Sequence, residues 1–186
     1  MTTQLKSKEY IFFDMDGTLV DTDYANFLAY QKAIKSVLNK SIKVDFDPTE
    51  RFNSYLLKKH YPKIRTELCD KIIQLKQQLF SEFLSETVLI PEASERLKQC
   101  HQNKKACLVT NSSFLRASQV MSFHGLNQFI TKVFCSDHRL RAKSKYHHAM
   151  EALQADNGLV EVFENEHLEV ANAMQAGIQV KNIIRM

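Results

Sequence analysis

Residues 10–18 read Tyr10-Ile11-Phe12-Phe13-Asp14-Met15-Asp16-Gly17-Thr18, and this stretch decides the fold of the chain. Four consecutive apolar or aromatic residues predict a strand, residues 10–14, that is buried on both faces. Asp14 and Asp16 then lie at its carboxyl end, where open α/β sheets bind their ligands. Two carboxylates beside a buried strand are costly unless something uses them. A hard cation, or a reaction that needs a nucleophile and an acid/base, would do so.

The chain after Pro91 alternates between helical and strand patterns. This rhythm predicts a parallel sheet with helices on both faces, an α/β, Rossmann-like core. The predicted helices cover residues 92–103, 113–124, 144–155 and 167–176, and the predicted strands cover 105–110, 130–135, 159–163 and 178–184.

Residues 22–88 carry apolar side chains at helical spacing and predict a small, all-helical cap inserted after the first strand. Its predicted helices are 24–38, 48–60 and 64–84, and the second begins with a capping box from Asp47 to Glu50. The predicted domains are therefore an α/β core, residues 1–21 and 89–186, and a cap, residues 22–88.

Composition excludes several classes of protein. The 186 residues carry a net charge of +4 without a block of Lys and Arg, so a nucleic-acid partner is not indicated. No apolar run approaches the roughly 18 residues of a membrane helix, and residues 1–9 lack the apolar core of a signal peptide. The four cysteines form no CxxC pair and indicate reduced thiols, hence a cytoplasmic protein. The oligomeric state stays open.

Polar side chains gather where the predicted strands end, and in a parallel sheet all of these ends open on one edge. The set combines carboxylates, a hydroxyl, a cation and further oxygen ligands, which suits phosphoryl transfer assisted by Mg²⁺. The residues concerned are Asp14, Asp16, Thr110, Lys143, Glu164, Asn165 and Glu169.

With these motifs in place, the chain resembles the haloacid dehalogenase (HAD) superfamily of hydrolases, in the branch of phosphoglycolate phosphatase and beta-phosphoglucomutase with a helical cap. The resemblance spans residues 10–184. Its motifs are Asp14 to Asp21, Leu108 to Ser112, Asp137 to Lys143, and Val162 to Glu166 followed by Ala171 to Ile178.

The resemblance implies a Mg²⁺-dependent phosphatase that acts on a small phosphorylated metabolite through an aspartyl phosphate. It implies that Asp14 is the nucleophile and Asp16 the acid/base. Thr110 and Lys143 would bind the phosphoryl oxygens, with Asn111 also at the substrate. Mg²⁺ would be held by Asp14, the carbonyl of Asp16, and the fourth motif through Glu164 and Asn165.

Two positions depart from the family pattern. The third motif reads Lys143-Ser144-Lys145 where the family has lysine-proline; spacing favours Lys143, and Lys145 is the alternative. Asn165 stands where the family usually has a Mg²⁺-binding aspartate, so weaker Mg²⁺ binding is expected, with Glu164 or Glu169 in a position to compensate.

Three other activities fit parts of the pattern. A phosphomutase of the same fold would use the same residues. A non-catalytic binding protein would explain Asn165, although the retention of Asp14, Asp16, Thr110 and Lys143 argues against it. A dehalogenase is disfavoured, because dehalogenases of the family lack the second aspartate, here Asp16.

Overall fold

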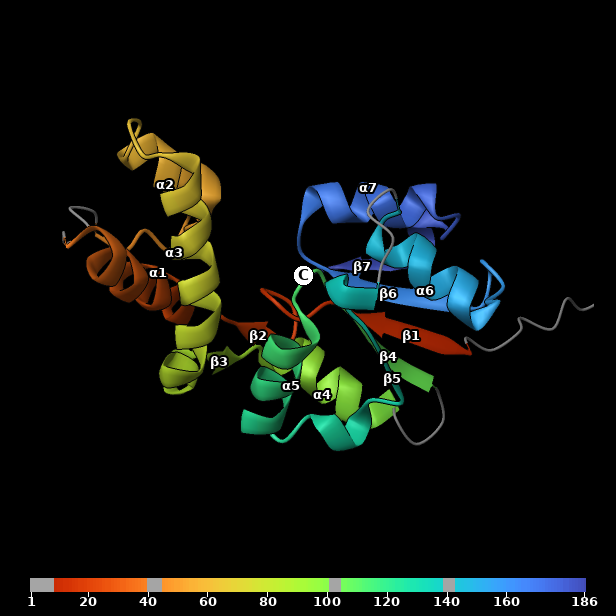
Figure 1. The fold of residues 1–186 in the computed structure, drawn as a ribbon. Helices are drawn as coiled ribbons and strands as arrows, with labels where there is room; N and C mark the ends of the chain where they lie inside the picture. Colours follow the sequence, from red (N-terminus) through yellow and green to blue (C-terminus); the bar gives the residue numbers. More distant parts are fainter. Residues whose placement is uncertain (1–8, 40–44, 101–104, 139–142) are drawn as a thin grey trace, which may run out of the picture. The chain divides into compact units, whose positions relative to one another are not determined.

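The structure is a computed structural model that describes residues 9–39, 45–100, 105–138 and 143–186. The chain forms two compact units (Figure 1). The first, the core unit, comprises Met1–Val20 and Leu89–Met186, and the second, the cap unit, comprises Asp21–Val88. The division falls after Val20 and before Leu89.

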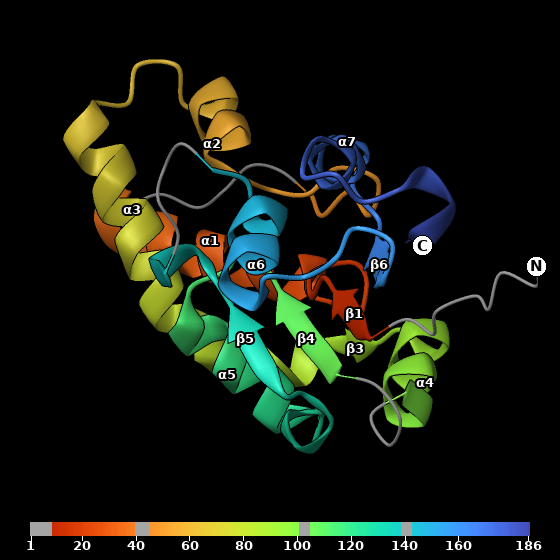
Figure 2. The ribbon, with the colours of Figure 1, turned by 90° about the vertical axis from the view of Figure 1, so that its right-hand side faces the viewer.

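A five-stranded parallel sheet is the centre of the core unit. Its strand order is β5-β4-β1-β6-β7, so the first strand of the chain lies in the middle. The strands are β1 (Tyr10–Phe13), β4 (Lys105–Val109), β5 (Lys132–Phe134), β6 (Val160–Glu164) and β7 (Ile183–Arg185). Figure 2 shows β1, β4 and β5 pointing the same way. The α/β fold with a parallel sheet that the alternating pattern predicts is therefore confirmed.

The continuous apolar run in β1 explains its central place. Ile11, Phe12 and Phe13 are fully buried, because helices cover both faces of the sheet. In register, Phe13 lies opposite Leu108 of β4 and Phe163 of β6. The three strands therefore end level with one another, which brings the residues that follow them to one edge.

Two helices cover each face of the sheet (Figure 1). On one face lie α4 (Pro91–Cys100) and α5 (Phe114–Phe123), and on the other lie α6 (Lys145–Leu153) and α7 (His167–Gln175). The second face is packed by Phe12, Tyr146 and Val162, among other residues of one buried cluster. Burial of this apolar surface anchors the first turn of α6 against the sheet.

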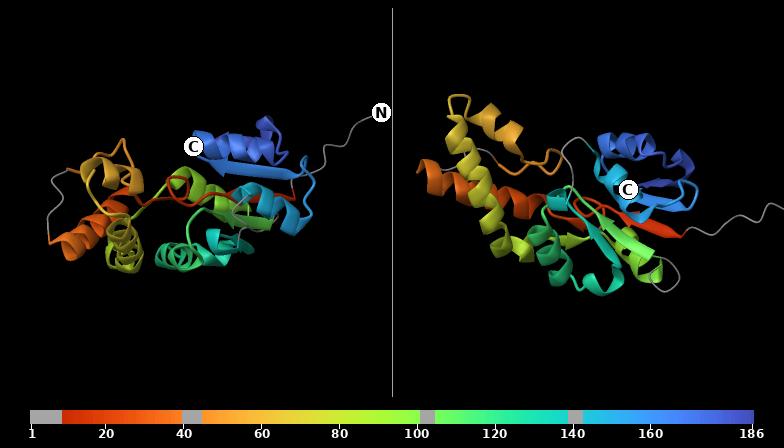
Figure 3. Two further views of the ribbon diagram at one scale, coloured as in Figure 1. Left: turned by 45° about the horizontal axis from the view of Figure 1, so that its top comes forward. Right: turned by 45° about the vertical axis from the view of Figure 1, so that its right-hand side comes forward.

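The cap unit is built from α1 (Asp23–Leu38), α2 (Ser54–His60), α3 (Thr66–Leu79) and the 3₁₀ segment η1 (Phe80–Glu86). Helices α1 and α3 pack against each other (Figure 3). Their shared core includes Tyr30, Ile34, Leu57 and Ile72. The helical periodicity of this segment therefore reflects a small apolar core of its own.

The predicted start of the second cap helix is wrong. Asp47 Oδ1 accepts hydrogen bonds from the backbone N and the hydroxyl of Thr49, at 2.8 and 2.6 Å, in an exposed turn that does not continue as a helix. Instead α2 begins at Ser54, and Asn53 Oδ1 caps it by accepting from the N–H groups of Tyr55 and Leu56. Both Asp and Asn bond to nearby backbone N–H groups, so a turn and a cap look alike in sequence.

Other boundaries also differ from the predictions. The predicted helix 64–84 breaks, because α3 ends at Leu79 and Phe83 of η1 has non-helical angles (φ −115°, ψ 19°). Two short strands that were not predicted, β2 (Val20–Asp21) and β3 (Val88–Leu89), pair with each other. The predicted helix 92–103 and the third motif, 137–143, extend into residues outside the described ranges.

Cys69, Cys100, Cys107 and Cys135 are buried and are not joined in disulfides. No helix within the described ranges has both the length and the apolar character needed to cross a membrane.

Candidate active site

The carboxyl edge of the sheet positions the candidate site. Asp14 follows β1 directly, and its N–H still donates to Phe163 O in the neighbouring strand (3.1 Å). Thr110 follows β4 and bonds in the same way to Phe134 O of β5 (2.9 Å). Glu164 is the last residue of β6. The sheet backbone thus fixes the start of each loop that supplies a polar side chain.

A buried cluster of three charged side chains lies at this edge. Lys145 Nζ is 2.6 Å from Asp14 Oδ1 and 2.7 Å from Glu164 Oε2. Asp14 is 5% exposed, Lys145 3% and Glu164 0%. One cation therefore bridges two buried carboxylates, an arrangement that is costly to assemble and strongly destabilised by loss of one partner.

Glu164 is fully engaged within the protein. Its Oε2 also accepts from the hydroxyl of Tyr146 (2.7 Å), and its Oε1 accepts from the N–H groups of Asn165 (2.9 Å) and Glu166 (3.0 Å). The family resemblance implies that Glu164 is a metal ligand. The structure instead turns this carboxylate toward Lys145, because β6 ends one residue later than predicted and keeps Glu164 in the core.

Burial and the neighbouring charges shift the pKa values of the side chains in this cluster. Burial raises the pKa of Asp14 to about 7; Lys145 opposes this shift, and the nearby Glu164 and Asp16 carboxylates add to it. Burial tends to lower the pKa of Lys145, but the two carboxylates outweigh it and raise that pKa, so the lysine stays charged. Burial and the Glu164 carboxylate raise the pKa of Tyr146, which remains a neutral donor. The site therefore favours additional positive charge.

The structure brings Lys145, and not Lys143, to Asp14. Lys143 Nζ binds both carboxylate oxygens of Glu151, at 2.7 and 2.6 Å, in an exposed ion pair. Ser144 caps α6 by accepting from the N–H of His147, so Lys145 becomes the first residue of the helix. From that position its side chain reaches into the sheet edge. The alternative lysine is the one that occupies the site.

Asp16 is held by two residues of the segment after β4. Arg116, in the first turn of α5, places NH2 2.6 Å from Asp16 Oδ1, and the Ser112 hydroxyl donates to Oδ2 (2.7 Å). The carboxylate is therefore fixed in direction while it remains partly exposed, at 14%. Fixed direction and some access to water are what an acid/base group needs.

Thr110 and Asn111 lie at the same edge. Thr110 is 1% exposed, and its Oγ1 accepts from the N–H of Ser112 (3.1 Å). Asn111 Nδ2 donates to Glu169 Oε1 (3.0 Å), while Glu169 Oε2 is buried and has no hydrogen-bond partner. A buried carboxylate oxygen without a donor is a place where a cation or water is favourable.

Asn165 packs against the loop that carries Asp16. Gly17 has φ +79°, and a Cβ there would come within 2.3 Å of the Asn165 amide, so only glycine allows this approach. The amide atom that faces the loop lies 3.0 Å from Thr18 Oγ1, 3.1 Å from Glu164 Oε1 and 3.2 Å from the carbonyl oxygen of Asp16. All three neighbours are oxygens.

The predicted metal ligands fit a hard cation in part. Within the described ranges, no group of three or more histidine, cysteine and acidic side chains is arranged to hold a metal. Mg²⁺, however, commonly uses one or two carboxylates together with water and substrate oxygens. In the predicted oxygen set, the inner amide atom of Asn165 lies 3.2 Å from the Asp16 carbonyl oxygen, and the Asp14 carboxylate and the unpartnered Glu169 Oε2 lie at the same edge of the sheet. Glu164 instead binds Lys145.

Four residues of the site were not assigned these contacts from sequence. Tyr146 and Arg116 each stand in the first turn of the helix that follows a predicted strand, which is the signal that could have identified them. Ser112 belongs to the second motif, where it binds Asp16, whereas its neighbour Ser113 caps α5. Lys145 was the alternative to Lys143.

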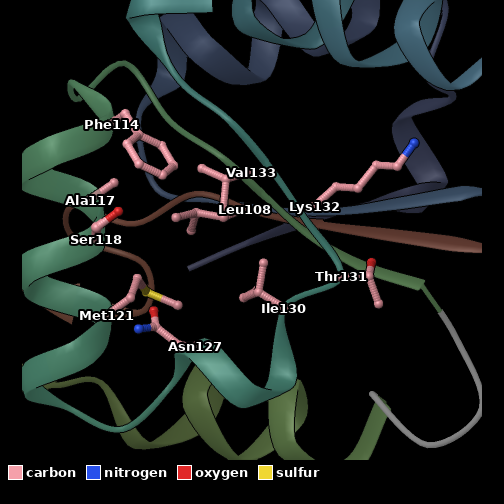
Figure 4. A pocket seen from close by; sticks show the side chains of 10 residues that line it. All are labelled: Leu108, Phe114, Ala117, Ser118, Met121, Asn127, Ile130, Thr131, Lys132 and Val133. Carbon is pink, nitrogen blue, oxygen red and sulfur yellow. The ribbon is translucent and has the colours of Figure 1, made fainter.

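A separate pocket of about 420 Å³ lies between α5 and β5 (Figure 4). Phe114 and Met121 point into it from α5, opposite Leu108 and Ile130. Lys145, Ser112 and Arg116, which bind Asp14 and Asp16, are not among its lining residues, so it is distinct from the charged site.

Comparisons with known proteins show the fold and the family of this chain. A predicted phosphatase from Clostridium acetobutylicum is 14% identical, with a TM-score of 0.75, over 92% of this chain and 82% of that one. CbbY from Rhodobacter sphaeroides, solved with phosphate, is 17% identical, with a TM-score of 0.72, over 92% and 84%. At these identities the likeness shows the fold. The family model for haloacid dehalogenase-like hydrolases matches residues 11–183, nearly the whole chain, and the chain therefore belongs to the haloacid dehalogenase-like hydrolases.

Proposed function

We propose that this protein is a phosphatase that hydrolyses a small phosphorylated metabolite through an aspartyl phosphate on Asp14. The observation that carries the proposal is the buried contact between Asp14 Oδ1 and Lys145 Nζ at 2.6 Å, beside an Asp16 carboxylate held by Arg116 and Ser112. A nucleophile, a cation for the phosphoryl oxygens and an oriented acid/base are the groups that phosphomonoester hydrolysis needs.

In the first step, a carboxylate oxygen of Asp14 forms a bond to phosphorus while the bond from phosphorus to the substrate oxygen breaks. Asp16 gives the departing oxygen its proton, and the alcohol leaves. The Lys145 ammonium lies beside the nucleophile, where it stabilises charge on the phosphoryl oxygens. Thr110, at the end of β4, would face the same oxygens.

In the second step, water attacks the aspartyl phosphate. Asp16, now a carboxylate, takes the proton from this water as its oxygen bonds to phosphorus. The bond between phosphorus and the Asp14 oxygen breaks, which releases inorganic phosphate and restores the carboxylate. Ser112 and Arg116 keep Asp16 in one position through both proton transfers.

Mg²⁺ is part of the proposal, held by Asp14, the Asp16 carbonyl and Asn165, with Glu169 close to the same edge. When bound, it would supply positive charge to the phosphoryl oxygens. The buried Glu169 Oε2, which has no hydrogen-bond partner, supports a further cation here.

The substrate class rests on the comparisons and on the site. CbbY was solved with phosphate, and a variant of it with xylulose-1,5-bisphosphate. A phosphorylated small molecule carries the negative charge that Lys145 would bind. A cytoplasmic location belongs to the same proposal, because four buried cysteines that are not joined in disulfides suit a reducing compartment.

Release of inorganic phosphate from a panel of phosphorylated metabolites, with Mg²⁺ and with EDTA, tests the proposal. We expect steady release of inorganic phosphate from at least one phosphorylated sugar or phosphorylated hydroxy acid, and faster release with Mg²⁺. A single burst followed by formation of an isomeric phosphate would indicate a phosphomutase instead. Absence of release from every substrate, together with measurable phosphate binding, would contradict the proposal and indicate a binding protein.

A further inference from the structure

The Asn165 amide group is surrounded on its inner side by three oxygens, of which only the Thr18 hydroxyl can donate a hydrogen bond. Its inner atom lies within 3.2 Å of Thr18 Oγ1, Glu164 Oε1 and the Asp16 carbonyl oxygen. Glu164 Oε1 already accepts from two backbone N–H groups and the Asp16 carbonyl is a pure acceptor, so neither could donate to an amide oxygen at this place. With the nitrogen inward, the two N–H groups of the amide have these three oxygens within hydrogen-bond distance as acceptors. The neighbouring oxygens therefore favour Asn165 with its nitrogen inward.

The same position suits an oxygen once a cation is present. The inner amide atom is 3.2 Å from the Asp16 carbonyl oxygen. Two ligands on adjacent corners of an octahedral Mg²⁺ site, each about 2.1 Å from the ion, are about 3.0 Å apart. Asn165 can therefore serve as a ligand only after its amide turns by half a rotation and gives up its hydrogen bonds.

We propose that the Asn165 amide nitrogen closes the metal site of this protein, bridging Asp16 O and Glu164 Oε1 in place of a cation. This inference rests on the metal position of the proposed function and concerns how that position is filled. Its consequence is that the amide satisfies these oxygens without Mg²⁺, and that Mg²⁺ must displace the hydrogen bonds of the amide to bind. An aspartate at this position would behave oppositely, since it has no N–H to donate.

The matched variant is Asn165→Asp, which changes one NH₂ into an oxygen and keeps the shape. In the metal-free variant, a carboxylate oxygen would face Glu164 Oε1 and the Asp16 carbonyl, with only the Thr18 hydroxyl able to donate. We expect a lower Tm than that of the wild type in EDTA. Gln175→Glu makes the same amide-to-acid change at an exposed position of α7 and serves as the control.

The experiment measures Tm by thermal unfolding in EDTA and over a Mg²⁺ titration, with calorimetric titration of Mg²⁺ as a second readout. For Asn165→Asp we expect a saturable rise in Tm of about 3–6 °C at ten times the Kd, from the free energy of binding and the size of the chain. For the wild type and Gln175→Glu we expect less than about 1 °C at the same Mg²⁺ concentration.

Equal Mg²⁺ stabilisation of the wild type and Asn165→Asp, or an unchanged Tm of Asn165→Asp in EDTA, would overturn the inference. If Asn165→Asp does not fold, Asn165→Ala replaces it: a lower Tm than that of the wild type supports the bridge, and an equal Tm contradicts it. None of these readouts needs turnover, so failure of the phosphatase assay and failure of this inference are separate results.

Discussion

Asp14→Asn is expected to lower kcat by about 10⁴-fold or more for any substrate that the wild type hydrolyses. The amide is a poor nucleophile and cannot form the acyl phosphate, so no later step can proceed. The amide keeps the size of the carboxylate and can still accept a hydrogen bond from Lys145, which is 2.6 Å away in the wild type. Steady-state phosphate release at saturating substrate measures the loss.

Asp21→Asn is the matched control for this variant. It makes the same change at an exposed residue of the same motif, and Asp21 Oδ1 accepts a hydrogen bond from the N–H of Asp23 (3.0 Å). We expect its kcat to stay within about twofold of the wild type, as for surface substitutions away from such a site. Activity in Asp14→Asn comparable to that of Asp21→Asn would exclude Asp14 as the nucleophile.

Lys145→Met is expected to have the second largest effect, on both stability and turnover. Removal of the cation leaves Asp14 and Glu164 buried without their partner, which costs about 3–5 kcal/mol of unfolding free energy. Loss of one charged donor at the phosphoryl oxygens lowers kcat by about 10²–10³-fold. Urea unfolding and phosphate release measure the two effects.

Lys143→Met separates the two lysines. Lys143 forms an exposed ion pair with Glu151, and such pairs contribute about 0–1 kcal/mol. We expect nearly wild-type turnover from Lys143→Met. If Lys145→Met does not fold, Lys145→Arg keeps the charge and provides the comparison, with lower turnover because a guanidinium replaces the ammonium at 2.6 Å from Asp14. Loss of turnover in Lys143→Met, with wild-type turnover in Lys145→Arg, would reverse the assignment.

Most of the core could be predicted from the sequence because its signals are local. The apolar run before Asp14 marks a strand buried on both faces, and it is the central strand. The alternating pattern after Pro91 then determines a parallel sheet, whose strand ends meet at one edge. Asp14, Asp16 and Thr110 were located from these two facts alone.

The remaining parts of the site depend on geometry that spacing does not encode. Lys143 and Lys145 are two residues apart, and the choice between them depends on Ser144, which caps α6 and makes Lys145 its first residue. From sequence, Glu164 could be a metal ligand in a loop or the last residue of a strand. Because β6 extends by one residue to include Glu164, the side chain lies in the core. The bond between Arg116 and Asp16 joins positions 100 residues apart, which no local pattern reveals.

The central claim is that Asp14 carries the phosphoryl group, and acid-quench mass spectrometry tests it most directly. The protein is mixed with a substrate that it hydrolyses, quenched in acid within milliseconds, digested and analysed for a phosphorylated peptide. Because acid preserves the acyl phosphate, we expect one phosphoryl group on the peptide that contains Asp14, and none in Asp14→Asn. A wild-type protein that turns over substrate without phosphorylation at Asp14, or with phosphorylation at another residue, would contradict the mechanism.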